Sequence, residues 1–183
     1  MQSIRKIAPA TLYWVQLRAI RHEFELRSGD ELCGMLHWEK AFGSLASATS
    51  DDGQWTFKRV GFLNPRVTIR QPGSDMDIAI FKPGWTGSGV LEFPSGRRFQ
   101  WEHKDFWRLD WTFQESGQEL LRFKSKAGSL KMNVRVDLAP SVKTLPEASL
   151  LALLGMYLLV LTRDDSVVAA SVTPATVVTV MKP

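Results

Sequence analysis

The feature that most constrains this chain is an unbroken apolar run, Leu145–Thr162, with the sequence LPEASLLALLGMYLLVLT. Its leucines and other apolar side chains point in every direction around a helix axis with about 3.6 residues per turn, so no polar face remains. A helix that is apolar all round is stable only inside a protein core or a lipid bilayer. The run therefore requires surroundings that cover it on every side.

Residues at both ends of the run predict where this helix begins and ends. Thr144 and Glu147 are three apart and fit a capping box, in which each side chain binds a free backbone N–H of the first turn. Pro146 falls in the first turn, where its missing donor costs nothing. Arg163 places a cation at the negative end of the helix dipole. These signals predict a helix of about 18 residues, about 27 Å long at about 1.5 Å per residue.

A membrane segment is one reading of the run. Crossing a hydrocarbon layer of about 30 Å takes about 20 apolar residues, and this run is slightly short. Glu147 near one end and Gly155 in the middle also weigh against a membrane segment. The alternative is burial in the protein, which needs an enclosing structure such as a closed antiparallel sheet.

The chain before this run shows the alternation of apolar and polar residues that is typical of short β-strands. Ser129–Leu138 is the clearest example, because Leu, Met and Val alternate along it with Lys, Asn, Arg and Asp. Ser28-Gly29-Asp30 is a three-residue turn that joins two such segments into a predicted hairpin. We count about ten to twelve candidate strands, spaced about 8 to 12 residues apart, with no amphipathic helix between them.

A sheet of this many strands tends to curl or close, and the lumen of a closed barrel needs apolar contents. The sequence therefore predicts a mainly β fold: a closed antiparallel β-barrel of about 12 strands wrapped around one central hydrophobic α-helix, Leu145–Thr162. We expect a single domain, 1–183, with a flexible N-terminus at 1–10 and the strands in 11–138. The valine-rich tail, 164–183, is expected to add an edge strand, to be disordered or to contact a partner.

Composition narrows the classes of protein to which the chain can belong. Its 183 residues are enough to bury a large core without disulfides. The single cysteine, Cys33, excludes an intramolecular disulfide and a cysteine-based zinc site. Met1–Ala10 lacks the long apolar stretch of a secretory signal, so we expect a cytoplasmic protein. The net charge of +4 permits anionic partners such as phospholipid headgroups, but it is too small to require nucleic acid.

Polar side chains that could carry catalysis do not form a recognisable site. Cys33 and His37 are four apart on a predicted strand, which puts them on one face but about 13 Å apart at about 3.3 Å per residue. A buried structural thiol is therefore expected rather than a nucleophile with its base. Glu102, His103 and Asp105 lie close together, but no second histidine has metal-ligand spacing, so a solvated turn is expected.

Three further segments are better explained as turns. Asp75 and Asp77, like the pair Asp51-Asp52, supply too few ligands for a dedicated calcium loop. Gly84–Gly89, GWTGSG, lacks the lysine and the helix that follow a phosphate-binding loop. We therefore predict no catalytic residue, no metal and no cofactor, and a protein that is not an enzyme.

The chain contains repeated units of an aromatic strand, a glycine turn and a second strand. These units are GQWTFKRVGF at Gly53–Phe62, GVLEFPSGRRFQWE at Gly89–Glu102 and WTFQESGQELLRFK at Trp111–Lys124. In these units and in the order of its elements over residues 10–162, the chain resembles the tubby C-terminal superfamily, which includes the phospholipid scramblases and the plant LURP-one-related proteins. The resemblance implies a barrel around a buried helix and a binding role, with phosphoinositide headgroups or a membrane as the partner.

The resemblance assigns no site residue by residue, since the chain has one cysteine and thus no scramblase cysteine cluster. A surface for anions or lipid is instead suggested by basic residues in neighbouring strands and turns. Arg97-Arg98 beside Lys58-Arg59 would form a shallow site for a phosphate-bearing headgroup, because each guanidinium offers two donors. The full predicted set is Lys58, Arg59, Arg66, Arg70, Arg97 and Arg98. The alternative is that these charges only keep the barrel exterior soluble.

The sequence thus leaves three functions open. The first is a cytoplasmic tubby-like binding module, membrane-associated or not, for anionic phospholipid headgroups or a protein partner. The second is a membrane-anchored protein that uses Leu145–Thr162 as its membrane segment. The third is a small-ligand carrier, or an enzyme without a recognisable motif, whose barrel has an open lumen.

Overall fold

A computed structural model describes residues 1–18, 22–40, 43–84, 87–105, 110–125 and 131–171. Within these ranges the chain forms two α-helices and one 3-10 helix: α1 (Ile4–Ile7), η1 (Pro140–Thr144) and α2 (Ala148–Ser171). Its twelve strands in the same ranges are β1 (Thr11–Gln16), β2 (Glu23–Ser28), β3 (Glu31–Trp38), β4 (Ala46–Ser50), β5 (Gly53–Val60), β6 (Arg66–Arg70), β7 (Asp77–Pro83), β8 (Gly89–Glu92), β9 (Arg98–Asp105), β10 (Asp110–Glu115), β11 (Gln118–Ser125) and β12 (Asn133–Leu138).

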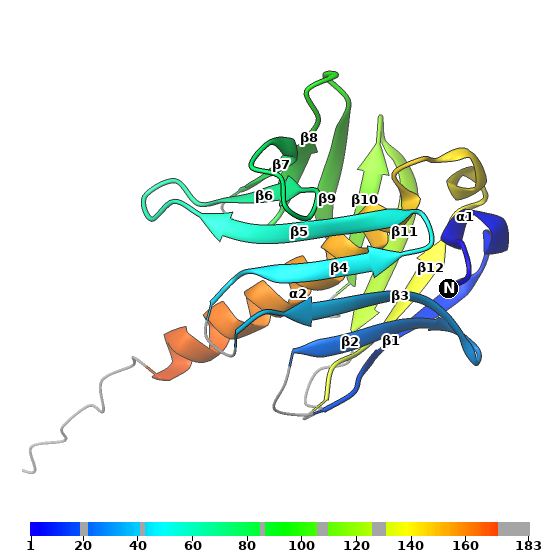
Figure 1. Ribbon diagram of the computed structural model, residues 1–183, viewed down its shortest axis with the longest axis horizontal. Helices are drawn as coiled ribbons and strands as arrows, with labels where there is room; N and C mark the ends of the chain where they lie inside the picture. Colours follow the sequence, from blue (N-terminus) through cyan, green and yellow to red (C-terminus); the bar gives the residue numbers. More distant parts are fainter. Residues whose placement is uncertain (19–21, 41–42, 85–86, 106–109, 126–130, 172–183) are drawn as a thin grey trace, which may run out of the picture.

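The strands form one closed antiparallel barrel in which each strand pairs with its neighbours in sequence (Figure 1). Closure occurs at β1, where Trp14 lies opposite Leu26 of β2 on one side and Val134 of β12 on the other. Alternate residues of β1 are buried and exposed, as expected for strands with one apolar face. The predicted closed antiparallel β-barrel of about twelve strands is therefore confirmed.

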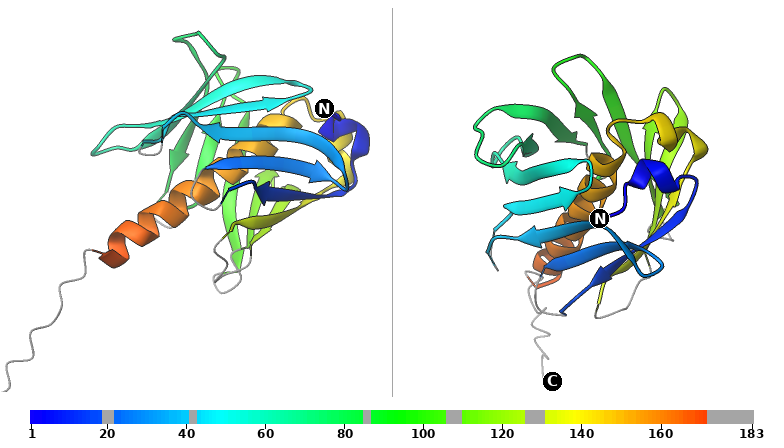
Figure 2. Two further views of the ribbon diagram at one scale, coloured as in Figure 1. Left: turned by 60° about the horizontal axis from the view of Figure 1, so that its bottom comes forward. Right: turned by 45° about the vertical axis from the view of Figure 1, so that its right-hand side comes forward.

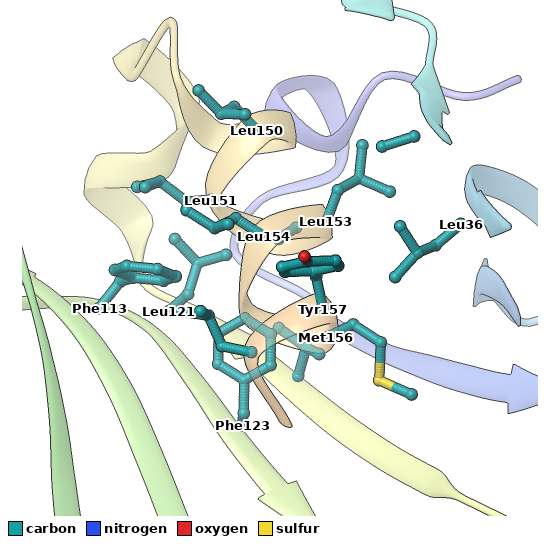
Figure 3. Packing of buried hydrophobic residues seen from close by; sticks show 14 of the residues in the cluster. Leu36, Phe113, Leu121, Phe123, Leu150, Leu151, Leu153, Leu154, Met156 and Tyr157 are labelled. Atoms are coloured by element: carbon teal, nitrogen blue, oxygen red, sulfur yellow. The ribbon is translucent and has the colours of Figure 1, made fainter. Parts of the chain in front are cut away.

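Helix α2 runs between strands of the barrel in both views of Figure 2. Every residue from Ala148 to Leu161 is buried, and the helix contacts β3, β4 and β5 as well as β11. The ring of Tyr157 stacks on Trp38 of β3, with 5.2 Å between ring centroids, while Leu121 and Phe123 of β11 pack nearby (Figure 3). In the described part of the chain no helix is long and apolar enough to cross a membrane.

The predicted capping box at the start of this helix is wrong. Thr144 is the last residue of η1, and its hydroxyl donates to the Ser141 carbonyl. Pro140 favours this short 3-10 turn, so α2 begins at Ala148 rather than at Leu145. The Glu147 carbonyl accepts the N–H of Leu151, while its carboxylate binds outside the helix.

The predicted C-terminus of the helix is also wrong, because α2 continues past Arg163 to Ser171. A cation favours a helix end but does not break the helix, and neither glycine nor proline follows until Pro174. The edge strand predicted for 164–183 is accordingly absent from residues 164–171, which are helical. The remainder of that segment, 172–183, lies outside the described residues.

The N-terminal segment, predicted to be flexible, packs against the barrel instead. Ile4 in α1 is fully buried, and the Gln2 N–H donates to the Leu32 carbonyl at 2.8 Å. Arg5 forms an ion pair of 3.0 Å with Asp52 in the turn between β4 and β5. Burial of the apolar Ile4 side chain explains why this segment packs on the barrel, since α1 contacts η1 and α2 at this end.

The two ends of the barrel therefore differ. At the end where α2 begins, α1 and η1 cover the barrel (Figure 1). At the end from which α2 leaves, cavities of about 560 and 180 Å³ lie beside the helix. These two cavities at the second end offer room for a ligand.

Candidate functional site

The hairpin that joins β5 to β6 projects on the side of the barrel from which α2 leaves (Figure 1). Its tip, residues 61–65, begins at Gly61, which has a φ of +86°. A Cβ at this position would lie 2.5 Å from the Asn64 carbonyl oxygen, so the turn requires glycine. The turn leaves Phe62 97% and Leu63 93% exposed. Two large apolar side chains thus stand side by side in solvent.

Two cations flank this tip. Lys58 is exposed on β5 opposite Thr68, and Arg66 is exposed at the start of β6 opposite Val60. Neither has an acidic partner among the residues that the structure describes. We call Lys58, Phe62, Leu63 and Arg66 the hairpin surface.

Arg59, between Lys58 and the tip, is directed to the helix instead. Its Nη1 donates to both carboxylate oxygens of Asp165, at 2.9 and 2.7 Å. The Ser44 hydroxyl accepts the Arg59 N–H and donates to the Arg59 carbonyl. The ion pair fixes the hairpin to α2 and neutralises the Arg59 charge, so the hairpin and the helix enclose a space.

That space is the cavity of about 560 Å³. Its walls come from β6, β7 and α2, and its rim includes the hairpin tip. The apolar residues that line the cavity are Leu63, Pro65, Val67, Phe81, Pro83, Leu158 and Leu161. The polar ones used below are Arg59, Arg66, Thr162 and Asp165. The volume is in the range of small-molecule sites, about 300 to 1,000 Å³.

The smaller cavity lies on another side of α2 and is more polar. Gln16, His22 and Asp164 are among its lining residues, and the Gln16 side-chain oxygen accepts the Met132 N–H at 2.9 Å. Burial, together with the neighbouring Asp165 charge, raises the pKa of Asp164. At about 180 Å³ this cavity is too small for most organic ligands.

The remaining predicted anion-binding residues are occupied by carboxylates. Arg70 binds Asp77 at 2.6 Å and approaches Asp75 at 3.6 Å. Arg98 lies 3.4 Å from Glu92. These pairs reduce the positive charge that either arginine presents to an anion.

Arg97 is the most fully paired of the set. Its Nε and Nη2 donate to Glu115 at 2.6 and 2.9 Å, and its Nη1 donates to Glu147 at 2.6 Å. Its guanidinium also lies over the ring of Phe99, 4.9 Å from the centroid. These contacts raise the pKa of Arg97, chiefly through the hydrogen bond to Glu115. Arg97, which precedes β9, thus joins the end of β10 to the residue before α2 rather than facing a ligand.

The predicted pairing of Arg97-Arg98 with Lys58-Arg59 is wrong in space. Arg97 binds Glu147 at one end of the buried helix and Arg59 binds Asp165 at the other, 18 residues and about 27 Å apart. Lys58 and Arg98 share an outer row, but the register Lys58, Thr68, Ile80, Glu92, Arg98 separates them by four strand spacings, about 19 Å. Of the predicted set, only Lys58, Arg59 and Arg66 lie at one place.

Cys33 and His37 do not share a face, contrary to the strand prediction. The register between β2 and β3 shifts between Leu26 and Arg27, so a bulge at Cys33 turns that side chain inward while His37 is exposed. Burial raises the pKa of the Cys33 thiol. A bulge cannot be read from alternation, which explains the error.

The other polar candidates have structural contacts. Glu102 accepts from the Gln114 amide at 3.1 Å, and the His103 ring meets Trp111 edge-on at 4.5 Å. Asp52 accepts hydrogen bonds from Ser3, Arg5 and Ser149. Within the described ranges, no three His, Cys, Asp or Glu side chains gather in a way that could hold a metal ion. Residues 85–86 of the glycine-rich segment and the Asp105 side chain lie outside the description.

Sequence reasoning missed the hairpin tip. Strand β5 ends at Val60, so Phe62 lies beyond it in the turn. The signal was present in Gly61 and in Asn64-Pro65, which are typical turn residues. Read as a turn, GFLNP places two apolar residues where no strand neighbour covers them.

Comparisons with protein-family models, with curated proteins and with solved structures found no match to this chain. The resemblance to the tubby C-terminal superfamily stays a prediction that rests on the order of elements.

Proposed function

We propose that this protein is a non-catalytic, tubby-like binding module whose hairpin surface docks on membranes that contain anionic phospholipid. In this proposal α2 is the packed centre of the barrel, and the outer surface carries the function. A cytoplasmic membrane face is the expected location, because anionic lipids are enriched there.

The exposure of Phe62 and Leu63 is the observation that carries the proposal. Fully burying such a side chain contributes about 1.5 to 3 kcal/mol of favourable free energy. In this fold two adjacent side chains remain exposed and do not make that contribution. Single exposed apolar residues are ordinary, but an adjacent pair at the tip of a projecting hairpin has the geometry of a wedge. A lipid interface would bury both side chains without any change in the barrel.

Charge favours a lipid surface as the occupant. Lys58 and Arg66 flank the apolar tip and lack acidic partners in the described ranges. Each basic residue close to an anionic membrane contributes about 1 kcal/mol of attraction. The apolar tip therefore suits the acyl chains of a bilayer, and the two cations that flank it suit the phosphates.

The packing around α2 supports a role outside the barrel rather than in a through-going lumen. Residues from Ala148 to Leu161 are buried, and Tyr157 lies between Trp38 and Phe57. Side chains from the helix and the strands thus occupy this stretch of the interior, whereas the two cavities described above lie at the end from which α2 leaves.

Liposome flotation tests the proposal. The protein should float with vesicles of phosphatidylcholine and phosphatidylserine, and should float less with phosphatidylcholine alone or in high salt. Phe62→Ser should weaken binding to the anionic vesicles. The double substitution Lys58→Gln and Arg66→Gln removes two charges near the membrane and should weaken binding about 30-fold, from about 1 kcal/mol per charge.

The double substitution Lys6→Gln and Lys143→Gln is the matched control. It removes the same charge from exposed residues of α1 and η1, at the opposite end of the barrel. Binding should stay within about twofold of the wild type, since these residues are distant from the proposed interface. Equal losses in both double variants, or no flotation of the wild-type protein, would contradict membrane docking and favour a protein partner.

A further inference from the structure

The cavity of about 560 Å³ beside α2 has walls of two kinds. Its deeper part is apolar: Val67 and Phe81 reach it from the strands, and Leu158 and Leu161 from the helix. All four side chains are buried by the rest of the fold. In this part of the cavity, burial of a ligand's apolar surface is favourable, whereas burial of its polar groups among apolar side chains is not.

The polar residues of the cavity are mostly satisfied within the protein. Asp165 and Arg59 neutralise each other, and the Thr162 hydroxyl donates to the Leu158 carbonyl at 2.9 Å. Arg66, at the rim, is the lining cation for which the described residues provide no acidic partner. Among the described lining residues, Arg66 is therefore the one positive charge without an acidic partner, and it is exposed.

We propose that this cavity binds a single-chain amphiphile with one anionic head group. The chain would lie against Val67, Phe81, Leu158 and Leu161, and the carboxylate or phosphate would bind the Arg66 guanidinium, whose planar donors fit either group. Sugars and nucleotides fit poorly, because the apolar walls would leave their polar groups without partners. A cationic chain would meet Arg66, and the lining carboxylate of Asp165 is already bound to Arg59.

Calorimetric titration of the full chain tests this proposal. The probes are laurate and lysophosphatidate with a twelve-carbon chain, each below its micelle concentration, and dodecyltrimethylammonium as the cationic counterpart. At least one of the anionic probes should bind saturably at one site, and the difference between them identifies the head group. Arg66→Gln should weaken that binding at least about tenfold, since it removes a charge-assisted hydrogen bond.

Leu161→Trp fills the cavity from the helix and should abolish binding of the anionic probes, while Leu45→Trp adds the same ring at an exposed position and should not. Val67→Phe fills the cavity from β6 and replaces Leu161→Trp if that variant lacks the wild-type circular dichroism spectrum. Binding of the cationic chain as tight as that of the anionic ones would overturn the proposal. So would wild-type affinity in a folded cavity-filling variant.

This inference does not depend on membrane docking, and the variants separate the two. Phe62 is not among the lining residues, so Phe62→Ser should reduce flotation and leave laurate binding unchanged. Leu161→Trp should do the reverse, because Leu161 is buried and would not itself contact a bilayer.

Discussion

The ring of Phe123 on β11 packs directly against the backbone of Gly155 in α2. A Cβ at Gly155 would lie 2.3, 2.6 and 2.9 Å from three atoms of that ring. Phe123 is itself held by Trp101, at 5.3 Å between ring centroids, and by Phe113, at 6.3 Å. Because Phe123 is fully buried between these rings, the helix approaches β11 closely at a residue that lacks a side chain.

We expect Gly155→Ala to destabilise the protein although alanine is the better helix former. Overpacking a filled core costs about 1 to 3 kcal/mol, whereas the gain in helix propensity is at most about 1 kcal/mol. Urea denaturation should give a net loss of about 1 to 2 kcal/mol in the free energy of unfolding. A more stable Gly155→Ala protein would show that the ring moves without cost.

Phe123→Leu in the Gly155→Ala background provides the control for this contact. The smaller side chain makes room for the new methyl group, so the two substitutions together should cost less than the sum of the single ones. A coupling of about 0.5 kcal/mol or more is expected for residues in contact. Additive losses would mean that the alanine acts elsewhere in the helix.

The second prediction concerns the pH dependence of the stability that Arg97 provides. Its hydrogen bonds, opposed by a smaller effect of burial, hold the pKa of Glu115 below its usual value. A carboxyl with a lowered folded-state pKa stabilises the fold above its unfolded pKa of about 4.3, and that contribution is lost as the pH falls. Arg97→Met should therefore cost about 1.5 to 3 kcal/mol at pH 7, and the difference from the wild type should shrink towards pH 3.

Thermal unfolding of both proteins across this pH range measures the effect, and Arg98→Met is the matched control. Arg98 lies next in the chain but is more exposed, 69% against 33% for Arg97, and its contact with Glu92 is longer. Its loss should change stability by less than about 1 kcal/mol. A pH-independent cost at Arg97 would assign its role to packing on Phe99 rather than to the ion pairs.

Asp52 joins three segments that are distant in sequence. Burial raises its pKa, but hydrogen bonds from Ser149, Arg5 and Ser3 outweigh this effect and lower the pKa overall. Asp52→Asn should therefore weaken the fold at pH 7, with a difference that fades as the pH falls through the pKa of the folded state. Trypsin should also cleave faster after Arg5 in the variant, because α1 loses a contact with the barrel.

Asp51→Asn is the control for this prediction, since Asp51 is exposed in the same turn. Its tryptic digestion should match that of the wild type. Equal cleavage after Arg5 in the Asp52→Asn and wild-type proteins would show that Ile4 alone secures the N-terminal segment.

The fold was largely predictable because its determinants are local. Alternation along Ser129–Leu138 predicts a strand, and β12 is found over Asn133–Leu138, while residues 129 and 130 lie outside the described ranges. A helix without a polar face must also be covered. The number of strands then favours closure. What failed depended on single residues that alternation does not report: the bulge at Cys33, the 3-10 turn at Pro140 and the turn that exposes Phe62.

The candidate site was less predictable because charge depends on tertiary partners. Arg59 and Asp165 are 106 residues apart in sequence, and Arg97 and Glu147 are 50 apart. No local pattern shows that these arginines are neutralised while Lys58 is not. The predicted set contains Lys58 and Arg66, the two cations of the proposed hairpin surface, but only the strand register and the ion pairs separate them from the others.

The last prediction concerns Asp164, whose pKa shift has the opposite sign to those of Glu115 and Asp52. Burial raises the pKa of its carboxyl, and the adjacent Asp165 charge adds to the increase, while His22, Arg163 and Arg59 oppose it. The Nε2 atom of His22 lies 3.9 Å away, too far for a hydrogen bond. A carboxyl whose pKa is raised by folding destabilises the fold once it ionises, so this cost is absent below the unfolded pKa and complete above the folded one.

Asp164→Asn should therefore raise the melting temperature at pH 7 and leave it unchanged near pH 3. Asp165→Asn, which removes the ion pair with Arg59, should not raise it at pH 7. The effect at Asp164 should be modest because the side chain is 45% exposed; a lower melting temperature for Asp164→Asn at pH 7 would show that its charge is used by a neighbouring cation.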